Sequence, residues 1–192
     1  MNTNKEVSIY KFIAALTFSI GILFLIPLIA MQFTDQVVWT LSDFIIAGTF
    51  LFGTGITYKL ITRKSGKSTY KLSIGFALFT GLFLLWVNGA VGIIGSENNP
   101  VNLLYFGVIA IGIIGAMITR VQAKGMAYTM FAMAFTQALI ASIAIIGGYH
   151  PNPDSAVFEI IAVNGFFIML FMISALLFRY HESLVPDGVQ SE

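Results

Sequence analysis

Apolar residues gather in six long runs along the chain, separated by short polar segments. A helix rises ~1.5 Å per residue, so about 20 apolar residues cross the ~30 Å hydrocarbon layer of a bilayer. Strands of a membrane barrel have only about 9–11 residues and alternate polar with apolar positions. The pattern therefore predicts six spanning helices, at about residues 12–31, 40–61, 72–94, 101–119, 126–148 and 156–178.

Backbone groups inside lipid must be paired within their own segment, which favours helices. We therefore expect an all-α polytopic membrane bundle of six transmembrane helices, forming one domain over residues 1–192 and arranged as three helical hairpins. Composition agrees, because 57% of residues are hydrophobic and 10% are charged, whereas a soluble domain carries roughly a quarter charged residues. The first run exceeds the roughly 7–15 apolar residues of a signal peptide. We interpret it as a retained helix that Pro27 bends or caps at its far end.

Positive charge is segregated along the chain. With the N-terminus in the cytoplasm, all 10 Lys and Arg residues fall on the cytoplasmic side of the six spans, and acids such as Asp35 and Asp154 fall on the other side. Short loops rich in Lys and Arg mark the cytoplasmic side, so both termini are expected there, in a bacterial inner membrane. Basic residues near helix ends are expected to contact lipid headgroups, namely Lys59, Arg63, Lys64, Lys71, Arg120 and Arg179.

Polar residues at membrane depth are costly and are therefore candidates for function. Most of them lie toward the outer side, with one near mid-membrane, and the set is Asp43, Asn88, Glu97, Asn98, Asn102, Gln137, Glu159 and Asn164. Carboxylates and carboxamides supply the oxygen ligands that suit hard cations, and they also hydrogen-bond polar solutes. One interpretation is thus an outer binding cluster for a substrate or ion, with Gln137 further along the path.

A structural interpretation stands beside the functional one. Asp43 and Glu159 lie in the first turn of their helices, where acids cap free N–H groups and complement the helix dipole. Residues 98–102, with Pro100, are typical of a turn followed by a helix start. Asn88, Asn164 and Gln137 are also expected to form hydrogen bonds between helices.

The sequence lacks the residues and motifs that several kinds of catalytic and metal-binding site require. The chain has no cysteine and only two histidines, and it contains no phosphate-binding loop, dinucleotide fingerprint, zinc-protease motif or nucleophile elbow. We therefore expect no enzyme activity, no cofactor and no metal site. The basic residues are spread over loops beside lipid, so no nucleic-acid partner is expected. The expected partners are the lipid bilayer and either further copies of the chain or another membrane protein.

The stretch from Trp86 to Tyr105, WVNGAVGIIGSENNPVNLLY, is distinctive. It resembles a motif of a family of small uncharacterised bacterial multi-pass inner-membrane proteins. Further matching pieces are Asp43-Phe44, Gly112-Ile113-Ile114-Gly115 and Asn164-Gly165-Phe166-Phe167. The resemblance implies an inner-membrane location and directs attention to the loop around Glu97, but it implies no activity.

Two functions follow as hypotheses. The first is a channel or transporter for a small cation or polar solute that uses the outer polar cluster. The alternative is a non-transporting structural or accessory subunit of a membrane complex, packed against partners through glycine-rich faces. The two differ in their demands on Asn88 and Asn164, because a subunit pairs these side chains with neighbouring helices.

Overall fold

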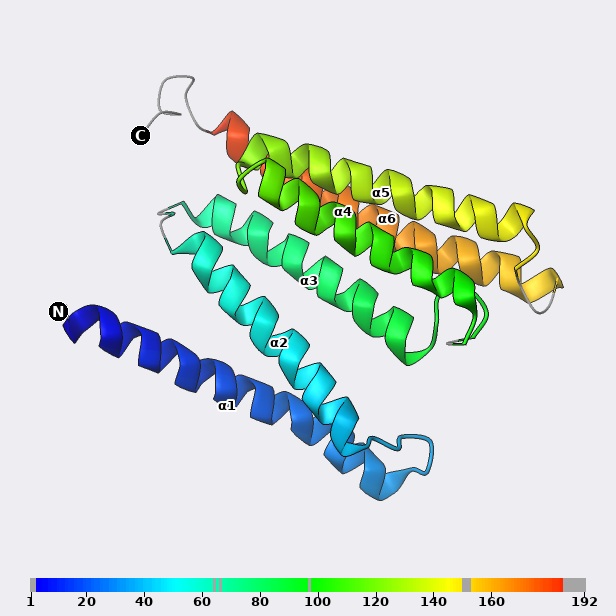
Figure 1. Cartoon of the computed structure of the whole chain (residues 1–192), viewed down its shortest axis with the longest axis horizontal. Coiled ribbons are helices and arrows are strands. Elements are labelled where there is room, and N and C mark those ends of the chain that lie inside the picture. Colours follow the sequence, from blue (N-terminus) through cyan, green and yellow to red (C-terminus); the bar gives the residue numbers. More distant parts are fainter. Residues whose placement is uncertain (1–2, 64, 66, 97, 150–152, 185–192) are drawn as a thin grey trace. The chain divides into compact units, whose positions relative to one another are not determined.

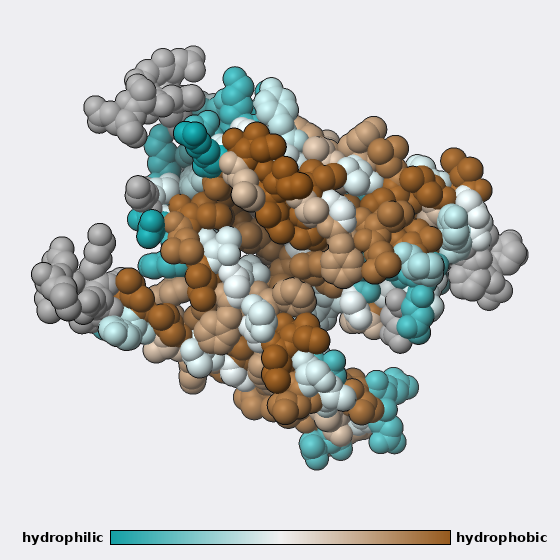
Figure 2. All heavy atoms as spheres, in the orientation of Figure 1, coloured by the Kyte–Doolittle hydropathy of each residue, from teal (hydrophilic) through white to brown (hydrophobic). Residues whose placement is uncertain are grey.

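The computed structural model describes residues 3–63, 65, 67–96, 98–149 and 153–184. Within these residues the chain is helical and contains no strand. Six helices are long and apolar enough to cross a membrane. On the face shown in Figure 2, apolar residues cover most of the helix surfaces and hydrophilic residues gather near helix ends. The expected all-α fold with six spanning helices is thus confirmed.

Along the described part of the chain, six α-helices and one short 3-10 helix follow each other (Figure 1). Their bounds are α1 Thr3–Phe33, α2 Leu41–Thr62, α3 Ser68–Ala90, η1 Pro100–Leu103, α4 Leu104–Ile118, α5 Ala123–Ile146 and α6 Pro153–Ser183. Pro27 lies inside α1 and does not end it, since the helix continues to Phe33. The helices divide into two units, Met1–Leu60 and Ile61–Glu192. The expectation of a single domain stays a prediction.

The first unit contains α1 and most of α2, which meet through an aromatic cluster. The ring of Phe44 on α2 stands edge-on to Phe24 on α1 at 5.3 Å, and Trp39 packs on the same ring at 5.0 Å. The Phe24 ring also lies over Gly48, where a Cβ would meet it at 3.5 Å, an ordinary van der Waals distance. Aromatic rings thus form the contact between α1 and α2.

The second unit contains α3 to α6. In this unit α5 packs most extensively against α6, α4 packs on α5, and α3 packs on α6. The α5 side of the main interface follows a repeat of three and four residues, which brings one stripe of a helix against its partner. Its buried members are Ala127, Met130, Ala134, Gln137, Ala141 and Ala144. The three alanines at seven-residue spacing let the helix backbones approach closely.

Buried residues of α6 serve two contacts. One stripe again alternates steps of four and three, namely Ile160, Asn164, Phe167, Phe171, Ser174, Phe178 and His181, and Leu170 and Ala175 are buried beside it. The Phe167 ring packs against Phe83 of α3 and the Phe178 ring against Tyr70 of α3, so part of this stripe faces α3. The polar residues Gln137 of α5 and Asn164 of α6 lie inside the α5–α6 interface.

The contact between α4 and α5 depends on glycine. A side chain at Gly112 would meet the Met133 sulfur at 2.9 Å, and one at Gly115 would collide with the Thr129 side chain. The methionine can move because its side chain is flexible, whereas threonine is stiff at its first torsion. Of these two glycines, Gly115 therefore has less room for a side chain.

The third helix ends earlier than expected. The predicted span continued to Ile94, but α3 ends at Ala90, so this boundary was wrong. Gly92 and Gly95 both have a φ of +72°, a left-handed conformation that breaks a helix and that glycine adopts without strain. Ile93 and Ile94 are nevertheless buried. Residues 91–96 thus fold back into the unit as a loop.

The sixth helix continues further than expected. The predicted span ended at Phe178, but α6 continues to Ser183. His181 is buried, and its Nδ1 forms a 2.7 Å hydrogen bond with the Thr69 hydroxyl of α3. The Tyr70 ring packs against His181, with 5.4 Å between ring centroids. Contacts with α3 therefore order this end of α6.

Candidate functional site

Three buried side chains from three helices form a polar centre, which comprises Tyr105 of α4, Gln137 of α5 and Asn164 of α6. The Tyr105 hydroxyl donates to Asn164 Oδ1 at 2.8 Å, and Gln137 Nε2 donates to the same oxygen at 3.1 Å. Asn164 Nδ2 donates to the Ile160 carbonyl of its own helix at 2.8 Å. Asn164 therefore links α4, α5 and α6 through one oxygen atom.

Beside the polar centre, the side chain of Asn102 holds the loop that follows α3. Its Oδ1 accepts hydrogen bonds from the backbone N–H of Ile93 at 3.2 Å and of Ile94 at 2.9 Å. Its Nδ2 donates to the carbonyls of Ile94 at 3.3 Å and of Ser96 at 2.7 Å. One carboxamide thus replaces the backbone partners that a helix would have supplied. A side chain at Gly92 would lie 2.7 Å from Asn102 Nδ2, so glycine is needed there.

Asn88 and Asn99 form hydrogen bonds that connect this loop to neighbouring segments. Asn88 Nδ2 on α3 donates to the Asn102 carbonyl at 3.1 Å. Asn99 caps η1 through a 3.1 Å bond from the Val101 N–H, and its Nδ2 donates to the Tyr149 carbonyl after α5 at 3.2 Å. The expected turn and helix start at residues 98–102 are confirmed. The loop is therefore tied to α3, to η1 and to the segment after α5.

Two carboxamide oxygens in this region have no partner. Among the described residues, buried Asn88 Oδ1 and Gln137 Oε1 accept no hydrogen bond. Asn88 is 6% exposed and Gln137 is 0% exposed. A buried carbonyl oxygen without a donor costs about 1–3 kcal/mol. The expected hydrogen bonds between helices thus exist for all three carboxamides, Asn88, Gln137 and Asn164. The side-chain oxygens of Asn88 and Gln137 can each still accept a hydrogen bond.

The structure describes two of the three acidic candidates, Asp43 and Glu159. Asp43 belongs to the first unit, where its Oδ2 accepts 2.7 Å hydrogen bonds from both the N–H and the hydroxyl of Thr40. The bond from the Thr40 N–H is one half of a capping box at the start of α2, in agreement with the structural interpretation. Glu159 and Asn98 are exposed, and Glu97 lies outside the described residues. Glu159 is thus exposed, whereas Gln137 and Asn164 of the same unit are bonded to each other.

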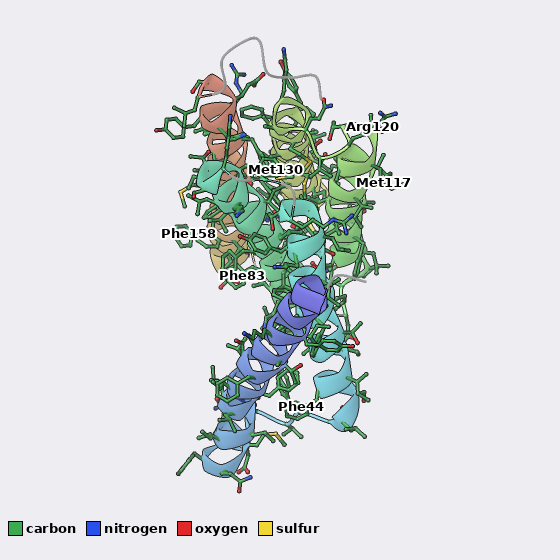
Figure 3. All side chains as sticks on the ribbon, turned by 90° about the vertical axis from the view of Figure 1, so that its left-hand side faces the viewer. Phe44, Phe83, Met117, Arg120, Met130 and Phe158 are labelled. Carbon is green, nitrogen blue, oxygen red and sulfur yellow. The ribbon has the colours of Figure 1, made fainter. Side chains whose placement is uncertain are left out.

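The basic candidates lie near helix ends. Lys59 is half-buried, with its Nζ 5.1 Å from the centroid of the Phe12 ring, and Lys71 is also half-buried. The side chains of Arg63, Arg120 and Arg179 are exposed, and Figure 3 shows Arg120 at the end of α4. Lys64 lies outside the described residues. Contact of these residues with lipid headgroups stays a prediction.

Tyr105 is the member of the polar centre that sequence reasoning missed. Its signal was its position three residues after Asn102, one turn further along the same segment. A buried tyrosine places its hydroxyl near a hydrogen-bond partner, but the sequence does not show which tyrosines are buried. Tyr105 is 1% exposed, whereas Tyr128 on α5 is 59% exposed.

Comparison of the chain with models of protein families, with curated proteins and with solved structures finds no match. The resemblance carried by residues 86–105 therefore stays a prediction. Inference about function rests on the geometry of the two units.

Proposed function

We propose that this multi-pass membrane protein is a non-transporting structural subunit of a membrane assembly. The observation that carries the proposal is the shared bonding of Asn164 Oδ1, which accepts from Tyr105 of α4 and Gln137 of α5. Polar side chains at membrane depth here join helices to one another. A cation pathway would instead require carboxylates beside these groups, and Glu159, the described acidic candidate of the same unit, is exposed.

A surface on α2 provides a means of assembly. Thr49, Gly53 and Thr57 recur at intervals of four residues and are all exposed, and nothing lies within 4 Å of a side chain built at Gly53. Gly55, which meets Leu16 of α1, lies on a different face of α2. Small residues four apart let membrane helices approach closely. We assign this stripe to contact with a partner helix. The proposed location of the protein is the inner membrane, with both termini in the cytoplasm.

Two measurements on the full chain test the proposal. The first is recovery of a stoichiometric membrane protein when the tagged chain is purified in native lipid. Gly53→Ile should reduce this recovery by at least about tenfold, because loss of ~1.4 kcal/mol changes an equilibrium tenfold. The same change at exposed Gly107 of α4, where nothing lies within 4 Å either, is the matched control.

The second measurement is flux of cations and small solutes into proteoliposomes. The structural proposal expects no flux above protein-free vesicles under any gradient. Flux that Asn88→Leu reduces, with folding intact, would instead favour the channel or transporter. Equal recovery of the partner with Gly53→Ile and Gly107→Ile would remove the assembly surface on α2 from the proposal.

A further inference from the structure

Among the described residues of the α3–α6 unit, four buried side-chain atoms have no hydrogen-bond partner: the hydroxyl oxygens of Thr119 and Ser174 and the carboxamide oxygens of Asn88 and Gln137. Gln137 Oε1 is buried in the middle part of α5 and has no hydrogen-bond partner among the described residues. The other end of the same carboxamide is held, because Gln137 Nε2 donates to Asn164 Oδ1 at 3.1 Å. Turning the amide over would place two oxygens together, so the free atom is an acceptor.

The neighbours of Gln137 reinforce this acceptor character. The Tyr105 hydroxyl uses its proton on Asn164 Oδ1, which leaves its oxygen able only to accept. Asn164 Nδ2 donates to the Ile160 carbonyl. The free capacity at the polar centre thus includes oxygen lone pairs on Gln137 and Tyr105, and a complementary ligand must donate hydrogen bonds.

A second buried acceptor lies nearer the end of the unit. Asn88 Oδ1 also lacks a partner, while Asn88 Nδ2 holds the Asn102 carbonyl. Asn102 lies three residues before Tyr105, so Asn88 is bonded to the segment that also carries the tyrosine of the polar centre.

The charge of the ligand follows from the side chains that the structure describes at the polar centre. They are a phenol and two carboxamides, all neutral. A cation buried there would have no compensating carboxylate among the described residues of the centre, which makes its transfer from water expensive. An anion would face oxygen atoms. We propose that Gln137 Oε1, together with the Tyr105 hydroxyl oxygen, binds a small neutral hydrogen-bond donor within the α3–α6 unit.

Water and small hydroxyl or amide solutes share this chemistry, and magnetic resonance on the full chain in bilayers separates them. The primary reporter is the side-chain nitrogen Nε2 of Gln137 in isotopically labelled protein. We expect one of two results: transfer of magnetisation from water to Nε2, which identifies water, or a saturable shift of Nε2 on titration with glycerol or formamide, which identifies an organic donor. If neither the transfer from water nor the saturable shift is observed, the proposal is overturned.

The chain supplies controls for both readouts. Gln122 is exposed and should receive magnetisation from water, whereas the backbone amide of Ala134, buried one turn from Gln137, should not. The variant Gln137→Met keeps the side-chain length and removes both the acceptor and the primary reporter, so Nδ2 of the neighbouring Asn164 side chain serves as a second reporter. The water or solute signal at this nitrogen should be at least about fivefold lower in the variant than in the wild type. An undiminished signal at Asn164 in a folded variant would overturn the assignment to Gln137. The wild-type measurement decides the proposal if this variant does not fold.

Discussion

At the scale of single residues, the position of Asn102 relative to the end of α3 decides how the chain continues. A helix that stops in an apolar environment exposes N–H and carbonyl groups that need partners. Asn102 meets this need by accepting from Ile93 and Ile94 and donating to Ile94 and Ser96. A carboxamide suits the position because it both donates and accepts, which neither a carboxylate nor an apolar side chain does.

Removing this carboxamide should destabilise the second unit strongly. Asn102→Ala leaves the N–H groups of Ile93 and Ile94 without partners, at about 1–3 kcal/mol each. We expect the free energy of unfolding to fall by about 2–4 kcal/mol in denaturant titrations in mixed micelles. Asn98→Ala, at an exposed position in the same connection, is the control and should change it by less than about 0.5 kcal/mol. Equal effects of the two changes would contradict the role of Asn102.

The polar centre makes a smaller contribution. Tyr105→Phe removes only the hydroxyl that donates to Asn164. Hydrogen bonds between membrane helices contribute about 0.6–2 kcal/mol, so a loss of that size is expected in the same titrations. Tyr128→Phe, on the exposed face of α5, should leave the midpoint unchanged. A stability gain in Tyr105→Phe would show that the bond does not hold α4 to α6.

Sequence reasoning found part of this site and missed the rest for a physical reason. Asn88, Gln137 and Asn164 stood out because polar groups are rare at membrane depth. Their partners were not evident, because tyrosine and backbone carbonyls occur throughout the chain and only the packing selects among them. For Asp43 the sequence left a binding role and a helix cap open, and the structure shows the bonds of the cap, whose partner Thr40 is only three residues away. Local bonds are thus predictable where distant bonds are not.

At the scale of elements, the separation of helix axes is set by which residues are small. Glycines on α4 bring α5 close, and α5 buries alanines at seven-residue spacing, whereas aromatic residues of α6 pack against α3. The lengths of the apolar runs predicted the number of helices, because the bilayer requires about 20 residues per span. They did not predict that α3 ends at Ala90, since Ile93 and Ile94 are as apolar as helix residues and are buried in a loop.

The close contact between α4 and α5 gives a prediction about Gly115. Gly115→Ala places a methyl group against Thr129 and should lower the free energy of unfolding by about 1–3 kcal/mol, the usual cost of overpacking. Thr129→Ala in the same chain should restore part of the loss. Gly107→Ala is the control, because nothing lies within 4 Å and alanine favours a helix by about 1 kcal/mol over glycine. A neutral Gly115→Ala would mean that α4 lies further from α5.

At the scale of the whole molecule, the two ends of the α3–α6 unit differ in charge. The hydrogen bonds Thr69–His181 and Tyr70–Val121 place the starts of α3 and α5 beside the ends of α4 and α6. The Lys and Arg residues of these four helices and their connection from α4 to α5 therefore belong to one end, and they include Lys71, Arg120, Lys124 and Arg179. The Asn102 loop lies at the other end. The Lys and Arg residues, which are separated by apolar runs in the sequence, thus gather at one end of this unit.

The position of the basic residues predicts which end of the unit faces the cytoplasm. Labelling of single introduced cysteines can test this without background, because the chain has no cysteine of its own. Gln122→Cys lies at the basic end and Asn98→Cys at the opposite end, both at exposed positions. A membrane-impermeant maleimide should label Asn98→Cys in intact cells and Gln122→Cys only after permeabilisation, because basic loops stay in the cytoplasm. The parent chain should give no signal. Labelling of both variants in intact cells would contradict the spanning of α4, since these two positions lie beyond its opposite ends.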